Sequence, residues 1–328
     1  MSSLDLTLNS SPDLQEQKRK ADKKKKRLKT LKQDLIGWSL GGIPFIGGTI
    51  VLGLFSKIMG YILPFFKIQG TNLKTMEFVG FDNFIYLFTN ENSKFWSSFA
   101  TSCYYLLSVP ICLTISLFVA VQLDKKIRGH GVFKVIMFLP TFVSGVAMAI
   151  FWRFVFQPEI GVLNSLIGLF GGESFDFLNT EWSYMPSILL TTTWGACANC
   201  ILFQAALGQV SEEMKEAARI DGATEKQIFW KITFPSITPT FFYQLVMSLI
   251  GALQVFTSLQ LLSNGTTGPN DAALSLVYYI YVMAFEWTGP GSGLGMAVAC
   301  GTIFKLFIIL LTVIVFKTSK GWVHYENE

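Results

Sequence analysis

The chain has 328 residues, of which 51% are hydrophobic and only 15% charged, and its formal net charge is +4. Uncharged runs of about 20 residues, the length that crosses a bilayer, recur along it, so the composition excludes a soluble globular protein and indicates a membrane protein. The charges are strongly segregated. Residues 16–32 hold ten basic and two acidic side chains, a net charge of +8, so the rest of the chain sums to −4.

The basic tail, residues 1–34, has two possible interpretations. A block of Lys and Arg can bind nucleic acid, but beside a membrane span it more often sets the orientation of that span and contacts anionic lipid. We therefore expect membrane lipid, and no nucleic acid, as its partner. No cleavable signal peptide is expected, because the charged region is too long and no small-residue cleavage site follows a short apolar core.

Six hydrophobic runs predict an all-α, polytopic membrane protein. The predicted spans are residues 35–56 continued to 66, 97–123, 132–157, 182–210, 236–262 and 293–316. The resulting divisions are a basic tail (1–34), a first transmembrane helix (35–66), an extracytoplasmic loop (67–96), a core domain (97–317) and a second tail (318–328).

Loop charges predict the orientation of these spans. If the basic tail is cytoplasmic, the loops on its side carry Lys125, Lys126, Arg128, Lys134, Lys317 and Lys320. On the other side, residues 158–181 and 263–291 contain no Lys or Arg, and only residues 67–94, with three Lys, depart from the trend. The excess of basic residues on one side places both termini in the cytoplasm.

One interior segment, residues 211–235, is densely charged, and we call it the charged loop. Ser211 can cap a first helix whose opening turn holds Glu212 and Glu213, carboxylates that are favourable at the positive end of a helix dipole. Gly222 should end this helix, because Gly tolerates the positive φ of a turn.

A second helix is predicted from about residue 223 to 233. It should stop before Pro235, whose ring disfavours helical geometry in the preceding residue. The charged loop is therefore expected to form a helix, a bend and a second helix on the cytoplasmic side, between the fourth and fifth spans.

The charged loop resembles the signature of the permease subunits of binding-protein-dependent ABC importers. That signature is Glu-Ala-Ala, three residues, Gly, nine residues, Ile, one residue and Leu-Pro. The matching residues here are Glu216, Ala217, Ala218, Gly222, Ile232 and Pro235. Phe234 stands where the family usually has Leu, and this exchange keeps an apolar side chain.

Other segments extend the resemblance, in particular to the maltose and multiple-sugar branch of that family. EAARIDGA followed by Gln227 and Phe229 is similar to carbohydrate permeases. So are GFDNF (80–84), FQPEIGVLN (156–164), LQVFTSLQLLSNGTTGP (253–269) and YYIYVMAFE (278–286). The resemblance covers roughly residues 97–317 and leaves out the basic tail.

The resemblance implies the type I ABC importer permease fold, in a bacterial cytoplasmic membrane, with the charged loop coupled to a separate ATPase. The coupling residues it implies are Glu216, Ala217, Ala218, Arg219, Asp221, Gly222, Ala223 and Pro235. The chain contains no Gly-Lys dipeptide and hence no Walker A motif. We therefore expect no enzymatic activity and no cofactor in this chain, and ATP and Mg²⁺ in the partner ATPase.

The resemblance also implies the other partners. They are a second, homologous permease that forms a heterodimer with this chain, two ATPase subunits and an extracytoplasmic sugar-binding protein. The binding protein would dock on residues 67–94 and 263–291, with the turn at 264–269 as a candidate contact.

Polar and aromatic side chains inside the predicted spans are candidates for the substrate path, because sugars are bound by hydrogen bonds and aromatic faces. The candidates are Trp194, Asn199, Gln204, Tyr243, Gln244, Gln254, Ser258 and Gln260. Each could instead bond a neighbouring helix. By resemblance to maltose-type permeases, residues 243–254 are the best candidates. The sugar itself is not specified. Hydrogen-bonding side chains on a helix suit a disaccharide, a longer oligosaccharide, a uronic-acid polymer fragment or glycerol phosphate, although no Arg cluster favours a strongly anionic ligand.

Two basic residues lie within predicted spans. Lys305 is near the middle of the sixth span, about 18 Å from either interface at the rise of an α-helix. A charge at that depth is costly and normally faces a path or a partner, so Lys305 is either a substrate-path or a pairing residue. Arg153 is close to the outer end of its span and can reach the interface.

The cysteines and histidines predict no metal or redox site. Cys197 and Cys200 have the spacing of such a pair but lack the second ligand pair that a zinc site needs, and all five cysteines fall within predicted spans. His130 and His324 are too far apart to form a site.

We interpret the sequence as the transmembrane subunit of an ATP-driven sugar importer. Two alternatives belong to other classes of protein. A secondary transporter would be expected to show inverted repeats and broken helices at the midplane. A membrane enzyme would need a convergent cluster of His or carboxylates. A membrane scaffold would need no such repeats and no such cluster.

Overall fold

The computed structural model describes residues 12–124, 129–289 and 291–324. The chain divides into two compact units, Met1–Ile62 and Leu63–Glu328. The predicted cytoplasmic charges at 125, 126 and 128 lie outside the described residues.

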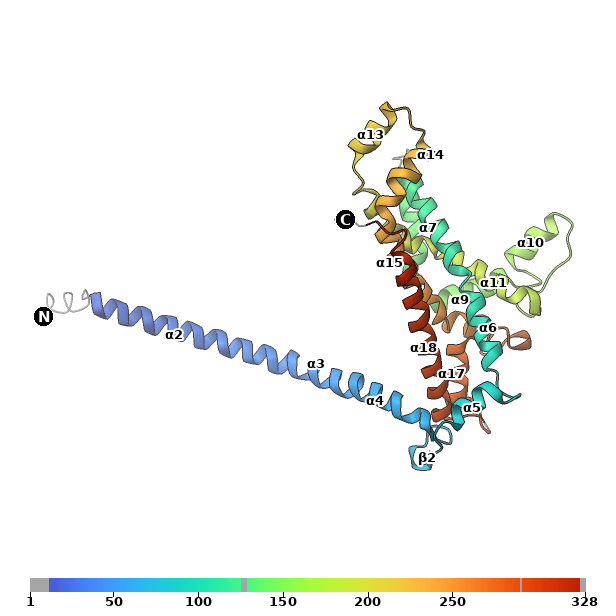
Figure 1. Cartoon of the computed structure of the whole chain (residues 1–328), viewed down its shortest axis with the longest axis horizontal. Coiled ribbons are helices and arrows are strands. Elements are labelled where there is room, and N and C mark those ends of the chain that lie inside the picture. Colours follow the sequence, from blue (N-terminus) through green and yellow to red (C-terminus); the bar gives the residue numbers. More distant parts are fainter. Residues whose placement is uncertain (1–11, 125–128, 290, 325–328) are drawn as a thin grey trace. The chain divides into compact units, whose positions relative to one another are not determined.

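The first unit is one run of helix with two π-helical turns, drawn in blue in Figure 1. Its elements are α2 (Pro12–Gly37), η1 (Trp38–Gly42), α3 (Ile43–Gly48), η2 (Thr49–Leu54) and α4 (Phe55–Ile62). The helix begins inside the basic tail, because Lys, Arg, Gln and Leu lose little side-chain freedom in a helix. Large apolar side chains such as Trp38 and Leu52 are exposed, as in a helix that faces lipid.

The second unit begins with a small subdomain that holds its two strands. It comprises η3 (Leu63–Phe65), β1 (Phe66–Lys67), η4 (Leu73–Thr75), β2 (Glu77–Phe78) and α5 (Asp82–Thr89). Strands β1 and β2 pair in antiparallel register, and the buried side chain of Asn83 donates to the carbonyl oxygens of Pro64 and Phe66.

The helices that follow form the body of the second unit. Up to the charged loop they are α6 (Phe95–Tyr105), α7 (Ser108–Asp124), α8 (His130–Phe138), η5 (Leu139–Phe142), α9 (Gly145–Val155), α10 (Val162–Leu169), α11 (Glu181–Trp194), η6 (Ala196–Asn199) and α12 (Cys200–Leu207). The remainder are α13 (Glu212–Ile220), α14 (Glu225–Ile228), η7 (Phe229–Thr233), α15 (Phe234–Leu253), α16 (Thr257–Leu262), η8 (Pro269–Asp271), α17 (Leu276–Phe285) and α18 (Leu294–Ser319). Figure 1 shows α13 and α14 at one end of this unit, and β2 and α5 at the opposite end.

The number of membrane spans agrees with the sequence only if bent helices are counted. In the described residues four helices are long and apolar enough to cross a membrane: Arg19–Phe65, Phe95–Asp124, Glu225–Leu253 and Leu294–Ser319. Two bent pairs bring the number to six if each counts as one span. The count of six and the cytoplasmic position of both termini stay predictions.

Three predicted segments differ from the observed helices. The third span is broken by 101° between η5 and α9, where Val143 is extended and Ser144 caps the next helix through the amide of Ala147. The predicted fifth span, 236–262, is wrong at its end, because the helix stops at Leu253 and α16 is separate. The predicted loop 263–291 contains α17, an apolar helix whose inner face is buried.

Side chains satisfy the backbone groups that these breaks release. Ser116 Oγ donates to the carbonyl of Ala196 in η6. At the start of α17, the amide of Leu276 donates to Ser102 Oγ at 2.8 Å, and Ser275 Oγ donates to a carbonyl between α15 and α16 at 2.7 Å. An unpaired backbone group in hydrocarbon costs several kcal/mol, so these buried serines allow helices to break inside the bundle.

Two clusters of buried apolar side chains form the core. The first joins α7, α11, α12 and α15 around Leu113, Tyr184 and Phe203. The second joins α17 to α18 around Tyr279, Met283 and Cys300. At its outer end α18 packs against the strand subdomain, where Gly295 leaves room for the carbonyl of Phe66.

We predict that Gly295→Ala lowers the thermal stability of the protein purified in detergent. The added Cβ would overlap the carbonyl oxygen of Phe66 in β1, and overpacking of this kind costs about 1–3 kcal/mol. Gly301→Ala in the same helix is the control, because its Cβ would meet nothing closer than Ile280 Cδ1 at 3.7 Å. Equal unfolding midpoints for the two variants would contradict this packing.

Candidate functional site

The first half of the charged loop has the predicted structure. Ser211 Oγ accepts a hydrogen bond from the amide of Met214 at 3.3 Å and so caps α13, whose first turn holds Glu212 and Glu213. The helix ends at Ile220, and Gly222, two residues further on, has φ +81°. An L-residue with a side chain would be strained in that conformation, so the bend depends on glycine.

The second half differs from the prediction at Pro235. Thr224 and Gln227 form a reciprocal capping box at the start of α14. The helix does not stop before Pro235 but continues through the π-helical turn η7 into α15. Pro235 is the second residue of α15, in its first turn, where the missing N–H of proline is tolerated. The amide of the preceding residue, Phe234, donates to the carbonyl of Phe229, five residues earlier, as in a π-helix.

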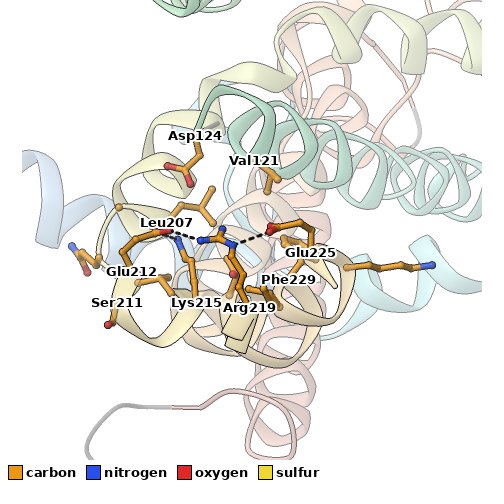
Figure 2. A pocket seen from close by; sticks show the side chains of 15 residues that line it. Val121, Asp124, Leu207, Ser211, Glu212, Lys215, Arg219, Glu225 and Phe229 are labelled. Atoms are coloured by element: carbon orange, nitrogen blue, oxygen red, sulfur yellow. Dashed lines mark hydrogen bonds and ion pairs between the residues drawn. The ribbon is translucent and has the colours of Figure 1, made fainter. Parts of the chain in front are cut away.

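Ion pairs join the two helices of the charged loop (Figure 2). Arg219 Nη1 lies 3.2 Å from Glu212 Oε1 on its own helix, and Arg219 Nε lies 2.9 Å from Glu225 Oε1 on α14. Lys215 Nζ lies 3.1 Å from the other oxygen of Glu212. Hydrogen bonds from Lys215 and then Arg219 lower the pKa of Glu212, while those to Glu225 and Glu212 raise the pKa of Arg219 above its ordinary value.

These residues line a cavity of about 1020 Å³ between the charged loop and the neighbouring helix ends. Val121 and Asp124 at the end of α7 form part of its wall, as Figure 2 shows. Lys215 and Ile228 are buried on this side. The inner side of the charged loop therefore faces this cavity.

The outer side of α13 is apolar and exposed. Met214 is 51% exposed and Ile220 is 87% exposed. With the exposed Ala217 they recur every three residues, so they lie along one face of the helix. Of these three residues, only Ala217 was predicted from the sequence. The three-residue spacing of Met214, Ala217 and Ile220 could have identified the other two as members of the same helix face.

The predicted substrate-path residues fall into three groups, of which the first lies between helices. Gln244 on α15 is 3% exposed and donates to the carbonyl of Asn199 at 3.1 Å. Asn199 Nδ2 in turn lies 3.5 Å from Ser248 Oγ. These contacts agree with the alternative that these polar side chains bond a neighbouring helix and not a sugar. In the described part of the chain, Gln204 Oε1 is buried without a hydrogen-bond partner.

The second group faces outward or into an open cavity. Tyr243 lies on one exposed face of α15 with Met247 and Gly251, and the exposed Gln254 directly follows the last residue of that helix. Gln254 also lines a cavity of about 640 Å³ together with Lys305 of α18. The structure thus brings Gln254 and Lys305 together.

The remaining candidates lie elsewhere. Trp194 is half-exposed at the end of α11, with its ring against those of Phe151 and Trp152. Ser258 and Gln260 lie on α16, which is separate from α15. The thiols of the Cys197 and Cys200 pair contact Met137 Sδ and the carbonyl of Ser116, respectively.

Comparison with known proteins identifies relatives of the whole chain. Residues 113–321 match the family described as "Binding-protein-dependent transport system inner membrane component". The probable ABC transporter permease protein YesP of Bacillus subtilis (strain 168) is 34% identical over 312 residues, covering 94% of this chain and 98% of that protein. The sn-glycerol-3-phosphate transport system permease protein UgpA of Yersinia enterocolitica is 32% identical over 253 residues, 76% of this chain and 83% of that protein.

A solved structure shows the same fold. It is a bacterial ABC transporter involved in the import of the acidic polysaccharide alginate. One of its chains superposes with a TM-score of 0.74 at 23% sequence identity, covering 90% of this chain and 98% of that one.

The lowered pKa of Glu212 gives a pH-dependent prediction. Its pairing stabilises the folded loop fully above the unfolded pKa of glutamate, about 4.3, and is lost as the pH falls through the lowered folded value. Lys215→Met should therefore raise the pKa of Glu212, whereas Lys226→Met should not. Carboxyl ¹³C shifts of labelled glutamate, titrated through acidic pH, measure this. An unchanged titration of Glu212 in Lys215→Met would contradict the pairing.

Proposed function

The chain belongs to the family of binding-protein-dependent transport system inner membrane components, and from this premise we propose that it forms half of the path of an ATP-driven sugar importer. The protein is a multi-pass component of a bacterial inner membrane. The observation that carries the proposal is the two-sided helix α13, which lies at one end of the second unit, opposite the strand subdomain (Figure 1). Its inner side lines the cavity, and its outer side presents exposed apolar residues.

We propose that the outer side of α13 docks on a separate ATPase subunit in the cytoplasm. Met214, Ala217 and Ile220 would enter an apolar groove, because their exposed surface gains free energy on burial. Ala217 allows a close approach, and the exposed acids Glu213, Glu216 and Asp221 beside it would pair with cations of the partner. ATP and Mg²⁺ would be bound by that partner.

The proposed substrate path runs along the exposed face of α15. Tyr243 supplies an aromatic face, and Gln254 and Lys305 supply hydrogen-bonding groups at the cavity that they share. A second permease of different sequence would close this face, since an open row of polar side chains is unfavourable in lipid. A saccharide fits such a lining of aromatic and amide groups.

The delivery of substrate is proposed at the strand end of the second unit. There the subdomain of β1, β2 and α5 lies at the end opposite the charged loop (Figure 1). The related alginate importer has been solved with an alginate pentasaccharide-bound periplasmic protein. We propose that a binding protein docks on the same side of this chain, with the turn at 264–269 as one contact.

Docking of the ATPase predicts that Ile220→Asp prevents co-purification of the ATPase subunits and abolishes ATP-driven uptake. Ile220 is 87% exposed, so the change should leave the fold intact while placing a charge in an apolar interface. Leu169→Asp is the matched control, because Leu169 is 80% exposed on α10, outside the charged loop. Full recovery of ATPases with Ile220→Asp would refute the docking surface.

The substrate path predicts that Gln254→Leu raises the KM of uptake by about threefold to tenfold, the effect of one lost hydrogen bond. The measurement uses proteoliposomes that hold the complete transporter, with its binding protein and a panel of neutral saccharides, uronate oligosaccharides and glycerol phosphate. Gln122→Leu on α7, outside this cavity, is the control. An unchanged KM for every transported compound would exclude Gln254 from the path.

A further inference from the structure

The ion pairs of the charged loop link two helices that the backbone joins only through a bend. Arg219 is on α13, and it pairs with Glu212 of the same helix and with Glu225 at the first position of α14. Each carboxylate contacts a different nitrogen of the Arg219 guanidinium. Because this group is planar and rigid, it fixes the positions of both carboxylates relative to each other. Lys215 holds the remaining oxygen of Glu212.

Two backbone hydrogen bonds close the bend itself: the amide of Gly222 donates to the carbonyl of Arg219 at 3.1 Å, and the amide of Ala223 donates to the carbonyl of Ala218 at 2.9 Å. Gly222 has φ +81°, and glycine has the widest backbone freedom of any residue. Once these two bonds break, α13 can turn about Gly222 without moving α14.

The other side of the bend is continuous with a membrane helix. α14 passes through η7 into α15 without an interruption before Leu253. Ile228 of α14 is buried, so the short helix is also fixed by packing. Whatever moves α14 must move the first turns of α15.

We propose that Arg219 is a positioning residue that clamps α13 to α14, so that movement imposed on the outer side of α13 reaches α15 instead of being absorbed at Gly222. The proposal rests on the proposed function, since it assumes an ATPase docked on that outer side. Arg219 acts through Glu212 and Glu225 of its own chain. The three side chains are solvent-exposed, and exposed ion pairs add little to stability, so removing the clamp affects coupling and leaves folding intact.

The test is the number of ATP molecules hydrolysed per substrate transported by the complete transporter in proteoliposomes. Arg219→Gln and Glu225→Gln are each expected to raise this ratio severalfold while the ATPases still co-purify. The double variant should be no worse than either single variant, because both remove the same pair. Arg219→Lys should restore part of the coupling, and Lys226→Gln on the same short helix should leave the ratio unchanged.

The outcomes separate this proposal from the proposed function. A direct contact between Arg219 and the ATPase would make Arg219→Gln harmful and Glu225→Gln harmless, and that result would overturn the clamp. An unchanged ratio in Arg219→Gln would overturn it as well. If no ATP-hydrolysing subunit co-purifies with the unaltered chain, the proposed function itself fails.

Discussion

The pairing of backbone hydrogen bonds within a hydrocarbon layer is the constraint on which the rest of this structure depends. A chain that crosses lipid must satisfy every N–H and C=O internally, yet the bundle contains helices that break at η6, after Leu253 and before α17. Ser116, Gln244 and Ser275 supply the missing partners at or beside these breaks. Gln244, which the sequence predicts as a substrate ligand, thus bonds the backbone of a neighbouring helix in the bundle.

The same principle bears on the proposed role of the charged loop as a transmitting element. Outside the membrane, water can satisfy backbone groups, so α13 can end freely at Gly222 and present exposed residues to a partner. Inside the membrane the chain must stay paired, and the turn η7 carries the helix past Pro235 into α15 without a gap. The bend at Gly222 therefore lies next to a continuous helix, and Arg219 on one side of the bend pairs with Glu225 on the other.

Residue types and their local spacing predicted much of the fold and of the charged loop. Features that depend on contacts between distant segments could not be predicted from the sequence. The cap at Ser211 and the bend at Gly222 follow from residue type alone, and the structure confirms both. The helix through Pro235 was missed because the rule for the residue before proline is only a steric preference, and Phe234 takes helical dihedral angles (φ −65°, ψ −46°) in spite of it. The helix α17 was missed because its apolar run is too short for a span, and its burial depends on α18.

The central claim is that α13 and α15 move as one body when the ATPases bind ATP. Spin labels at positions 213 and 226, introduced into a variant of the complete transporter that lacks the five cysteines, would report the distance between α13 and α14 by pulsed electron paramagnetic resonance. A second pair at positions 213 and 74 would report movement of the charged loop relative to the strand subdomain. The account predicts one narrow 213–226 distance, the same without nucleotide and with ATP, and a shift in the 213–74 distance. A 213–226 distance that broadens or shifts on ATP binding would contradict it.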